Sequence, residues 1–163
     1  MTAMTADHAA VRLERLIPAP PHRVYRAWLE PDLLRRWLAP GDLQVTRVEV
    51  DERVGGHYRV WHADAGSEVG GFECELLELV PDRRIVLRWG FAGPRRTEGP
   101  VYDSLLTITL RGAPGGTALT LVHERLEALA AGMPEVSEQV RPGWELVLGK
   151  LAAMAEGRST CEG

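Results

Sequence analysis

The chain has 163 residues, of which 45% are hydrophobic and 26% are charged, a composition typical of a single globular domain. Its formal net charge of -4 argues against nucleic acid as the main partner, because phosphate binding needs a positively charged face. No apolar run approaches the roughly 18 residues that a membrane-spanning helix requires, so we expect no membrane span.

The two ends of the chain predict one folded unit between two polar segments. Residues 1–10 lack the basic and apolar regions of a secretory signal, so we expect a flexible N-terminus on a cytoplasmic protein. A single domain is expected over 11–156, followed by a flexible tail over 157–163. Cys74 and Cys161 predict no disulfide, since Cys161 lies in that tail, and two free thiols fit a reducing compartment.

The first elements in chain order are an extended segment and two short helices. Apolar residues from Val11 to Ile17 predict a strand, and the prolines that follow favour a turn and a helix start. Apolar side chains then repeat at helical spacing up to Trp37, with an interruption at Pro31. The sequence therefore predicts two short helices that meet at Glu30-Pro31.

The middle of the chain changes to period two, which predicts a run of strands. Turns or loops are expected at Gly55-Gly56, over 63–68, at Pro81-Asp82, over 92–100 and over 112–116. Between these turns, alternating apolar residues predict strands around Val45–Val50, His57–His62, Val69–Val80, Ile85–Trp89, Leu106–Leu110 and Leu119–His123.

The last predicted element is a helix. Trp144, Leu148 and Leu151 belong to an apolar stripe on one face, and Pro142 marks either its first turn or a kink in a helix that begins near Glu135. The order of strand, two helices, strands and helix predicts an α+β fold, a curved antiparallel sheet of six to seven strands around the long C-terminal helix. One helix cannot fill the hollow of such a sheet, so a cavity beneath it is expected.

Six segments, taken together and in this order, resemble one family. They are Ile17-Pro18-Ala19-Pro20 with Val24-Tyr25-Arg26-Ala27-Trp28; Glu30-Pro31 with Leu34 and Arg36-Trp37; Arg53-Val54-Gly55-Gly56-His57-Tyr58-Arg59; Gly71 with Leu79-Val80-Pro81-Asp82-Arg83; Gly116-Thr117 with Leu119-Thr120-Leu121; and Gly143-Trp144. Over about residues 11–155 the chain is similar to the START-like (SRPBCC) superfamily, in particular to bacterial proteins related to the C-terminal domain of the Hsp90 ATPase activator. The resemblance implies a helix-grip fold with a hydrophobic cavity, and it leaves the ligand open because a fold does not fix a function.

Aromatic side chains dominate the candidate ligand wall, since they give large apolar contact at low entropic cost. Trp28 and Trp37 are expected to pack at the end of the sheet or on its convex side instead. The predicted ligand-binding residues are Trp61, Phe72, Trp89, Phe91, Tyr102, Leu106, His123, Trp144 and Leu148.

His123 continues an inward, apolar strand face, where a neutral imidazole could orient a ligand or act as a general base, or simply form hydrogen bonds at the rim. His57 and His62 are five residues apart in one strand and point to opposite faces, so no metal site is expected. Glu73 and Glu75 share a face opposite Cys74. If Cys74 points inward, both carboxylates face water; in the opposite register they would be acid/base candidates.

Three functions compete on this sequence. The first is binding of an apolar small molecule, such as a lipid, polyketide or aromatic metabolite, for carriage, sequestration or sensing. The second is a cyclase-, dehydratase- or hydrolase-type enzyme that uses His123 as acid or base. The third is a co-chaperone-like domain with a protein partner. The sequence predicts no catalytic residue, cofactor or nucleic-acid partner, and an exposed edge strand could pair two chains into a homodimer.

Overall fold

A seven-stranded antiparallel sheet forms the body of the computed structural model, which describes residues 10–39, 41–94 and 99–162, with side chains up to Glu156. The spatial order is β1-β7-β6-β5-β4-β3-β2. The strands are β1 (Ala10–Ile17), β2 (Gln44–Val50), β3 (His57–Asp64), β4 (Ser67–Val80), β5 (Arg84–Ala92), β6 (Val101–Ala113) and β7 (Gly116–Glu124). The predicted α+β class and strand number are confirmed.

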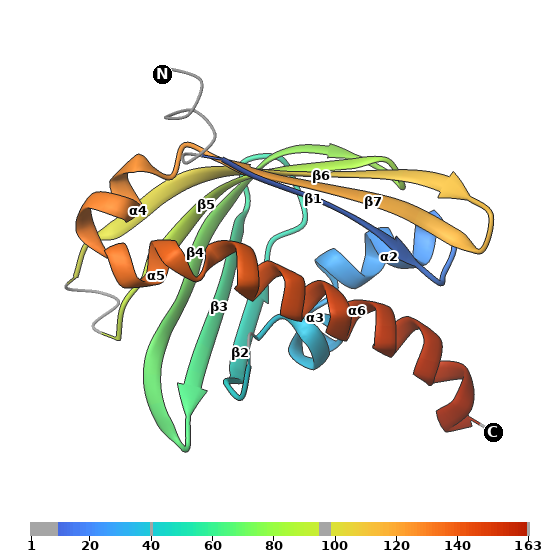
Figure 1. Ribbon diagram of the computed structural model, residues 1–163, viewed down its shortest axis with the longest axis horizontal. Coiled ribbons are helices and arrows are strands. Elements are labelled where there is room, and N and C mark those ends of the chain that lie inside the picture. The colour runs from blue at the N-terminus through green and yellow to red at the C-terminus, as the bar shows by residue number, and fades with distance from the viewer. Residues whose placement is uncertain (1–9, 40, 95–98, 163) are drawn as a thin grey trace.

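Five helices accompany the sheet in the described part of the chain. They are α2 (Pro21–Leu29), α3 (Pro31–Trp37), α4 (Glu127–Gly132), α5 (Pro134–Glu138) and α6 (Val140–Glu162). Figure 1 shows the sheet bending so that β1, β7 and β6 lie on one side and β3 and β2 on the other, with α6 running across the hollow between them. This is the expected helix-grip arrangement, and it places α6 against β1 and α3.

The two short helices form as the prolines predict. Pro21 and Pro31 each occupy the first turn of a helix, where the missing N–H removes no intrahelical hydrogen bond. Glu30, with extended backbone angles, ends α2 and begins α3. The predicted boundary at Glu30-Pro31 is therefore confirmed.

The tryptophans of these helices correct one expectation. Trp28 and Trp37 are both fully buried, with their rings 4.7 Å apart, and Trp28 also packs on Trp144 of α6 at 5.9 Å. Of the two expected positions, the convex side is wrong, because Trp28 contacts α6 on the concave side of the sheet, and the first, the end of the sheet, is not contradicted. Bulky side chains from α2, α3 and α6 therefore fill the concave side of the sheet at this end.

The turn between β3 and β4 is shorter than expected. Residues with positive φ allow such a short turn to match the twist of the two strands. β3 and β4 are joined by Ala65 (φ 54°) and Gly66 (φ 89°), so most of the predicted loop over 63–68 belongs to strands. The predicted turn at Pro81-Asp82 is present, with Asp82 at φ 65°. Of the expected loop over 92–100, residues 95–98 lie outside the described residues.

The C-terminal part contains more helix than the sequence predicted. α4 and α5 precede α6, and Pro142 lies in the first turn of α6, the first of the two alternatives. The helical trace continues to Glu162, into the segment expected to be a polar tail, and the Cys161 side chain lies outside what the structure describes, as do residues 1–9. Within the described chain, no helix combines the length and apolarity needed to cross a membrane.

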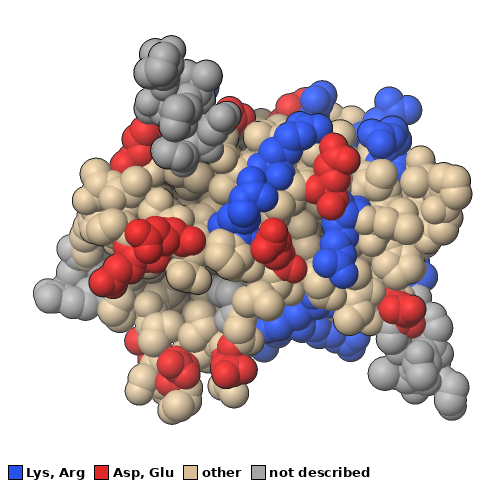
Figure 2. Space-filling view, viewed as in Figure 1, with Lys and Arg blue, Asp and Glu red and all other residues tan. Residues whose placement is uncertain are grey.

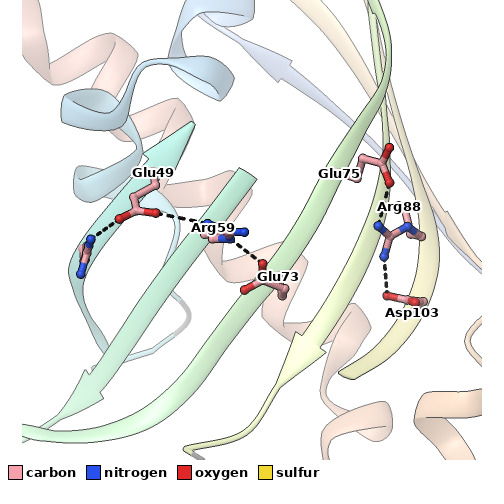
Figure 3. A network of polar contacts seen from close by, with 7 residues as sticks. Glu49, Arg59, Glu73, Glu75, Arg88 and Asp103 are labelled. Carbon is pink, nitrogen blue, oxygen red and sulfur yellow. Dashed lines mark hydrogen bonds and ion pairs between the residues drawn. The ribbon is translucent and has the colours of Figure 1, made fainter. Parts of the chain in front are cut away.

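Charged residues are spread over the outside of the molecule, between wide uncharged areas (Figure 2). On the face that carries α6, positive and negative side chains are interspersed (Figure 2). On the opposite face of the sheet, ion pairs run across the strands from Glu49 to Arg59 to Glu73, and from Glu75 to Arg88 (Figure 3). Arg88 also pairs with Asp103. Because Cys74 is buried, both glutamates point away from the core, which is the first of the two predicted registers.

Candidate functional site

A cavity of about 430 Å³ lies between the inner face of the sheet and the N-terminal half of α6. Strands β3, β4 and β5 form one wall, while α5 and α6 form the other. The segment between α3 and β2 closes the remaining side through Leu38, Gly41 and Leu43. This volume is within the range of ordinary small-molecule sites.

Four aromatic rings make the central wall. Phe72 and Phe91 are cross-strand partners with ring centroids 5.7 Å apart, and Trp89 packs on Phe72 at 4.6 Å. Trp144 approaches Trp89 from α6 at 5.5 Å. Even-numbered residues of β4 and odd-numbered residues of β5 share this inner face, which explains why the strands present the rings together.

Few polar groups reach the cavity. The described residues that line it include His62 and Gln139 but no Asp, Glu, Lys or Arg. His62 is buried, and its Nε2 donates a 2.8 Å hydrogen bond to the carbonyl of Leu38. A charged ligand would lose its hydration here without gaining a counter-charge, so the cavity suits an uncharged, largely apolar molecule.

The mouth of the cavity is apolar. Val69 on β4 is 40% exposed and Leu146 on α6 is 54% exposed, although both line the cavity. On the third side, the Gly41 carbonyl accepts a 2.8 Å hydrogen bond from Lys150 Nζ, which also donates to the Ala39 carbonyl. Lys150 therefore ties the segment after α3 to α6 beside the opening.

His123 lies behind this wall and forms a complete hydrogen-bond chain. Trp144 Nε1 donates to His123 Nδ1 at 2.9 Å, and His123 Nε2 lies 2.7 Å from Ser104 Oγ. Since Nδ1 accepts, the proton of the neutral ring is on Nε2 and is donated to Ser104. The Ser104 hydroxyl in turn donates to the Trp89 carbonyl at 2.8 Å.

This chain gives His123 a structural role. The side chain is fully buried, and desolvation lowers its pKa from 6.5 to about 3, so the ring is neutral. Nδ1 is occupied by the indole N–H, and Nε2 cannot take the Ser104 proton because it already carries one. Ser104 and His123 are therefore not arranged as a nucleophile and its base. The hydrogen-bonded alternative describes His123 correctly, but deep in the core and not at the rim.

Four of the nine predicted ligand-binding residues line the cavity: Phe72, Trp89, Phe91 and Trp144. Leu106, His123 and Leu148 are fully buried in the surrounding core and are not among the lining residues. The structure brings these three to the second layer of side chains around the cavity.

Tyr102 and Trp61 are not brought to the cavity. Tyr102 is the cross-strand partner of Phe91, but its ring packs against Gly132 of α4, where an added Cβ would lie 2.1 Å away. Trp61 points to the outer face of β3, where the Arg47 guanidinium lies 4.9 Å from its ring centroid. Its neighbours Val60 and His62 are buried, so the alternation of the strand sends Trp61 outward.

Several lining residues were not predicted. His62 shares the inward face of Tyr58 and Val60, so strand alternation could have identified it. Met133, Val136 and the residues after α3 have no comparable signal, since they come from short helices and an irregular segment. Among the described residues, no group of three or more His, Cys, Asp or Glu is placed to hold a metal ion.

Comparisons with known proteins agree with this geometry. Residues 18–156 match the sequence profile of the family described as "Activator of Hsp90 ATPase homolog 1-like protein". None of the curated proteins matches the sequence. Among solved structures, CV1439 of Chromobacterium violaceum is 36% identical, with a TM-score of 0.73 over 91% of this chain and 97% of that one.

Two further solved structures are similar. NE0264 of Nitrosomonas europaea, at 22% identity, shares the fold with a TM-score of 0.75 over 94% of this chain and 97% of that one. DynU16, from the dynemicin biosynthetic locus, is 26% identical with a TM-score of 0.66, over 91% of this chain and 47% of that one.

Proposed function

The chain belongs to the Activator of Hsp90 ATPase homolog 1-like family, within the START-like superfamily, and from that premise we propose that it binds an uncharged, apolar small molecule. The observation that carries the proposal is the cavity of about 430 Å³, whose described lining is aromatic and aliphatic and has no charged side chain. A lipid with a neutral head, a polyketide or an aromatic metabolite fits this description.

Burial of apolar surface supplies the binding free energy in such a site. Phe72, Trp89, Phe91 and Trp144 contact one another, so their rings are already fixed and lose little further entropy when a ligand arrives. The exposed Val69 and Leu146 at the mouth give an apolar path to the interior. Carriage, sequestration and sensing all require this property, and the proposal covers the binding step that they share.

The enzyme hypothesis has less support. It assigned acid/base chemistry to His123, whose two ring nitrogens are occupied by Trp144 and Ser104. The outward-facing Glu73 and Glu75 are paired with Arg59 and Arg88 on the other side of the sheet. A protein partner, a cytoplasmic location and a homodimer remain predictions from the sequence.

A cavity-filling variant tests the proposal. The neutral fluorophore N-phenyl-1-naphthylamine serves as the probe, with tryptophan quenching and a thermal-shift measurement as readouts. Val136→Phe places extra volume in the cavity wall, and Val54→Phe makes the same change at a residue that is 61% exposed and does not line the cavity. A neutral ligand at 100 times its dissociation constant should stabilise the fold by about 2.7 kcal/mol.

We expect the probe to bind the unmodified protein and to quench its tryptophan emission. Val136→Phe should lose this binding, and Val54→Phe should retain it. Displacement by fatty alcohols, sterols, flavonoids or aromatic polyketides then gives the ligand class. Failure of the probe to bind, or equal binding in both variants, would contradict the cavity as the site. In that case the hypothesis of a protein partner becomes the better supported one.

A further inference from the structure

A second hollow, of about 320 Å³, lies at the opposite half of α6. It is bounded by α2, α3 and the end of β1, and it shares no lining residue with the first cavity. Helix α6 contributes Val140, Gly143, Trp144, Leu146 and Val147 to the first cavity, but Leu151, Met154 and Ala155 to this one. We call this hollow the α2–α6 groove.

The floor of the α2–α6 groove is apolar. Ile17, Val24 and Leu151 are buried there, and Leu33 and Met154 are half-buried at its surface. An alkyl chain placed on this floor would cover the two half-buried side chains and remove their apolar surface from contact with water, which is favourable.

The rim of the groove is positively charged, in contrast to the first cavity. Arg26 does not add to this positive charge, since it bonds two carboxylates, Glu30 at 2.8 Å and Glu52 at 2.7 and 2.9 Å. Glu30 itself lines the groove, so the positive charge of the rim comes from Arg23 and Arg36. Arg23 and Arg36 are exposed and form no ion pair with any residue that the structure describes. Figure 2 shows positive side chains below α6, where Figure 1 places α3.

An apolar floor beside two arginines without counter-ions matches a particular ligand chemistry. We propose that the α2–α6 groove binds a free, single-chain amphiphile with an anionic head, such as a medium-chain carboxylate. The chain lies on Leu33, Met154 and Leu151, and the carboxylate accepts hydrogen bonds from Arg23 and Arg36. The small volume favours such a molecule over a peptide segment, which needs a longer surface.

The proposal implies that the protein sorts ligands by head-group charge. An uncharged molecule prefers the first cavity, whose described lining has no charge, whereas a carboxylate gains its counter-ions only in the groove. Each site contains one methionine among its lining residues, Met133 in the cavity and Met154 in the groove. Methyl-labelled methionine therefore reports on the two sites separately.

The experiment is an NMR titration of the methionine methyl groups with decanoate and, in parallel, with decanol. Assignment uses Met133→Leu and Met154→Leu. We expect decanoate to shift the Met154 methyl, and added salt to weaken this effect because the contact is electrostatic and exposed. Decanol should leave Met154 unchanged.

Matched variants test the role of charge. Arg23→Gln with Arg36→Gln should weaken the decanoate effect on Met154 by about tenfold or more. Arg35→Gln with Arg83→Gln removes the same charge from two exposed arginines outside the groove and should have little effect. An unresponsive Met154, or a decanoate shift that survives in the first double variant, overturns the proposal. The N-phenyl-1-naphthylamine experiment tests the first cavity independently, so the two failures are distinguishable.

Discussion

The indole nitrogen of Trp144 donates a 2.9 Å hydrogen bond to Nδ1 of His123, and it joins α6 to β7 directly behind the cavity wall. The Trp144 ring lines the cavity, and the His123 ring is fully buried behind it. The pair therefore fixes the position of the aromatic wall, since a buried acceptor without its donor is costly.

Trp144→Phe should destabilise the fold, because it keeps most of the ring but leaves His123 Nδ1 without a donor. Trp28→Phe is the matched control, since the Trp28 indole N–H is buried and has no hydrogen-bond partner among the described residues. We expect Trp144→Phe to lower the free energy of unfolding by about 1–3 kcal/mol more than Trp28→Phe does, in urea denaturation. Equal losses in the two variants would show that the hydrogen bond contributes nothing.

The free energy of unfolding should decrease as the pH is lowered through the window set by the pKa of His123. Its folded-state pKa, about 3, lies below the ordinary 6.5, so between these values the unfolded chain binds a proton that the native chain does not. The contribution is complete above pH 6.5 and is lost progressively toward pH 3, at a slope of at most about 1.4 kcal/mol per pH unit. Comparison with His123→Gln isolates this slope, and identical pH profiles for the two proteins would refute it.

Lys150→Met should loosen the segment after α3 with little effect on global stability. Lys150 holds the carbonyls of Ala39 and Gly41, and no other lysine exists in the chain. We expect faster hydrogen exchange at Gly41 and Leu43, and faster probe association and release at the cavity mouth. Lys150→Arg retains a donor and should stay close to the wild type. Unchanged exchange in Lys150→Met would mean that the segment is held by other contacts.

Glu73→Gln and Glu75→Gln should leave binding of N-phenyl-1-naphthylamine unchanged, because both carboxylates lie on the outer face of the sheet (Figure 3). The Glu75–Arg88 pair is partly exposed, so a double-mutant cycle should give a coupling of about 0.2–1 kcal/mol. Loss of probe affinity in either glutamine variant would place a carboxylate in contact with the ligand, against the structure.

Local patterns explain which site residues could be predicted. Phe72, Trp89 and Phe91 lie on strands whose alternation is regular, so their common face was readable from spacing. Trp61 was assigned to the cavity although it alternates with the buried Val60 and His62. Tyr102 has the inward position that was expected, but α4, which the sequence did not predict, covers its ring with Gly132.

The amino-acid sequence by itself determined the order of elements, the proline-defined helix boundary at Glu30 and, through the family pattern, the helix-grip fold. Each of these depends on spacing along a short stretch of chain or on a family pattern. The limits of the cavity, the Trp144–His123–Ser104 chain, the Lys150 contact and the α2–α6 groove were decided only by tertiary structure. They join residues that are distant in the sequence, from 19 positions for Ser104 and His123 to 134 positions for Ile17 and Leu151 in the groove. No local periodicity specifies which of such distant residues will meet.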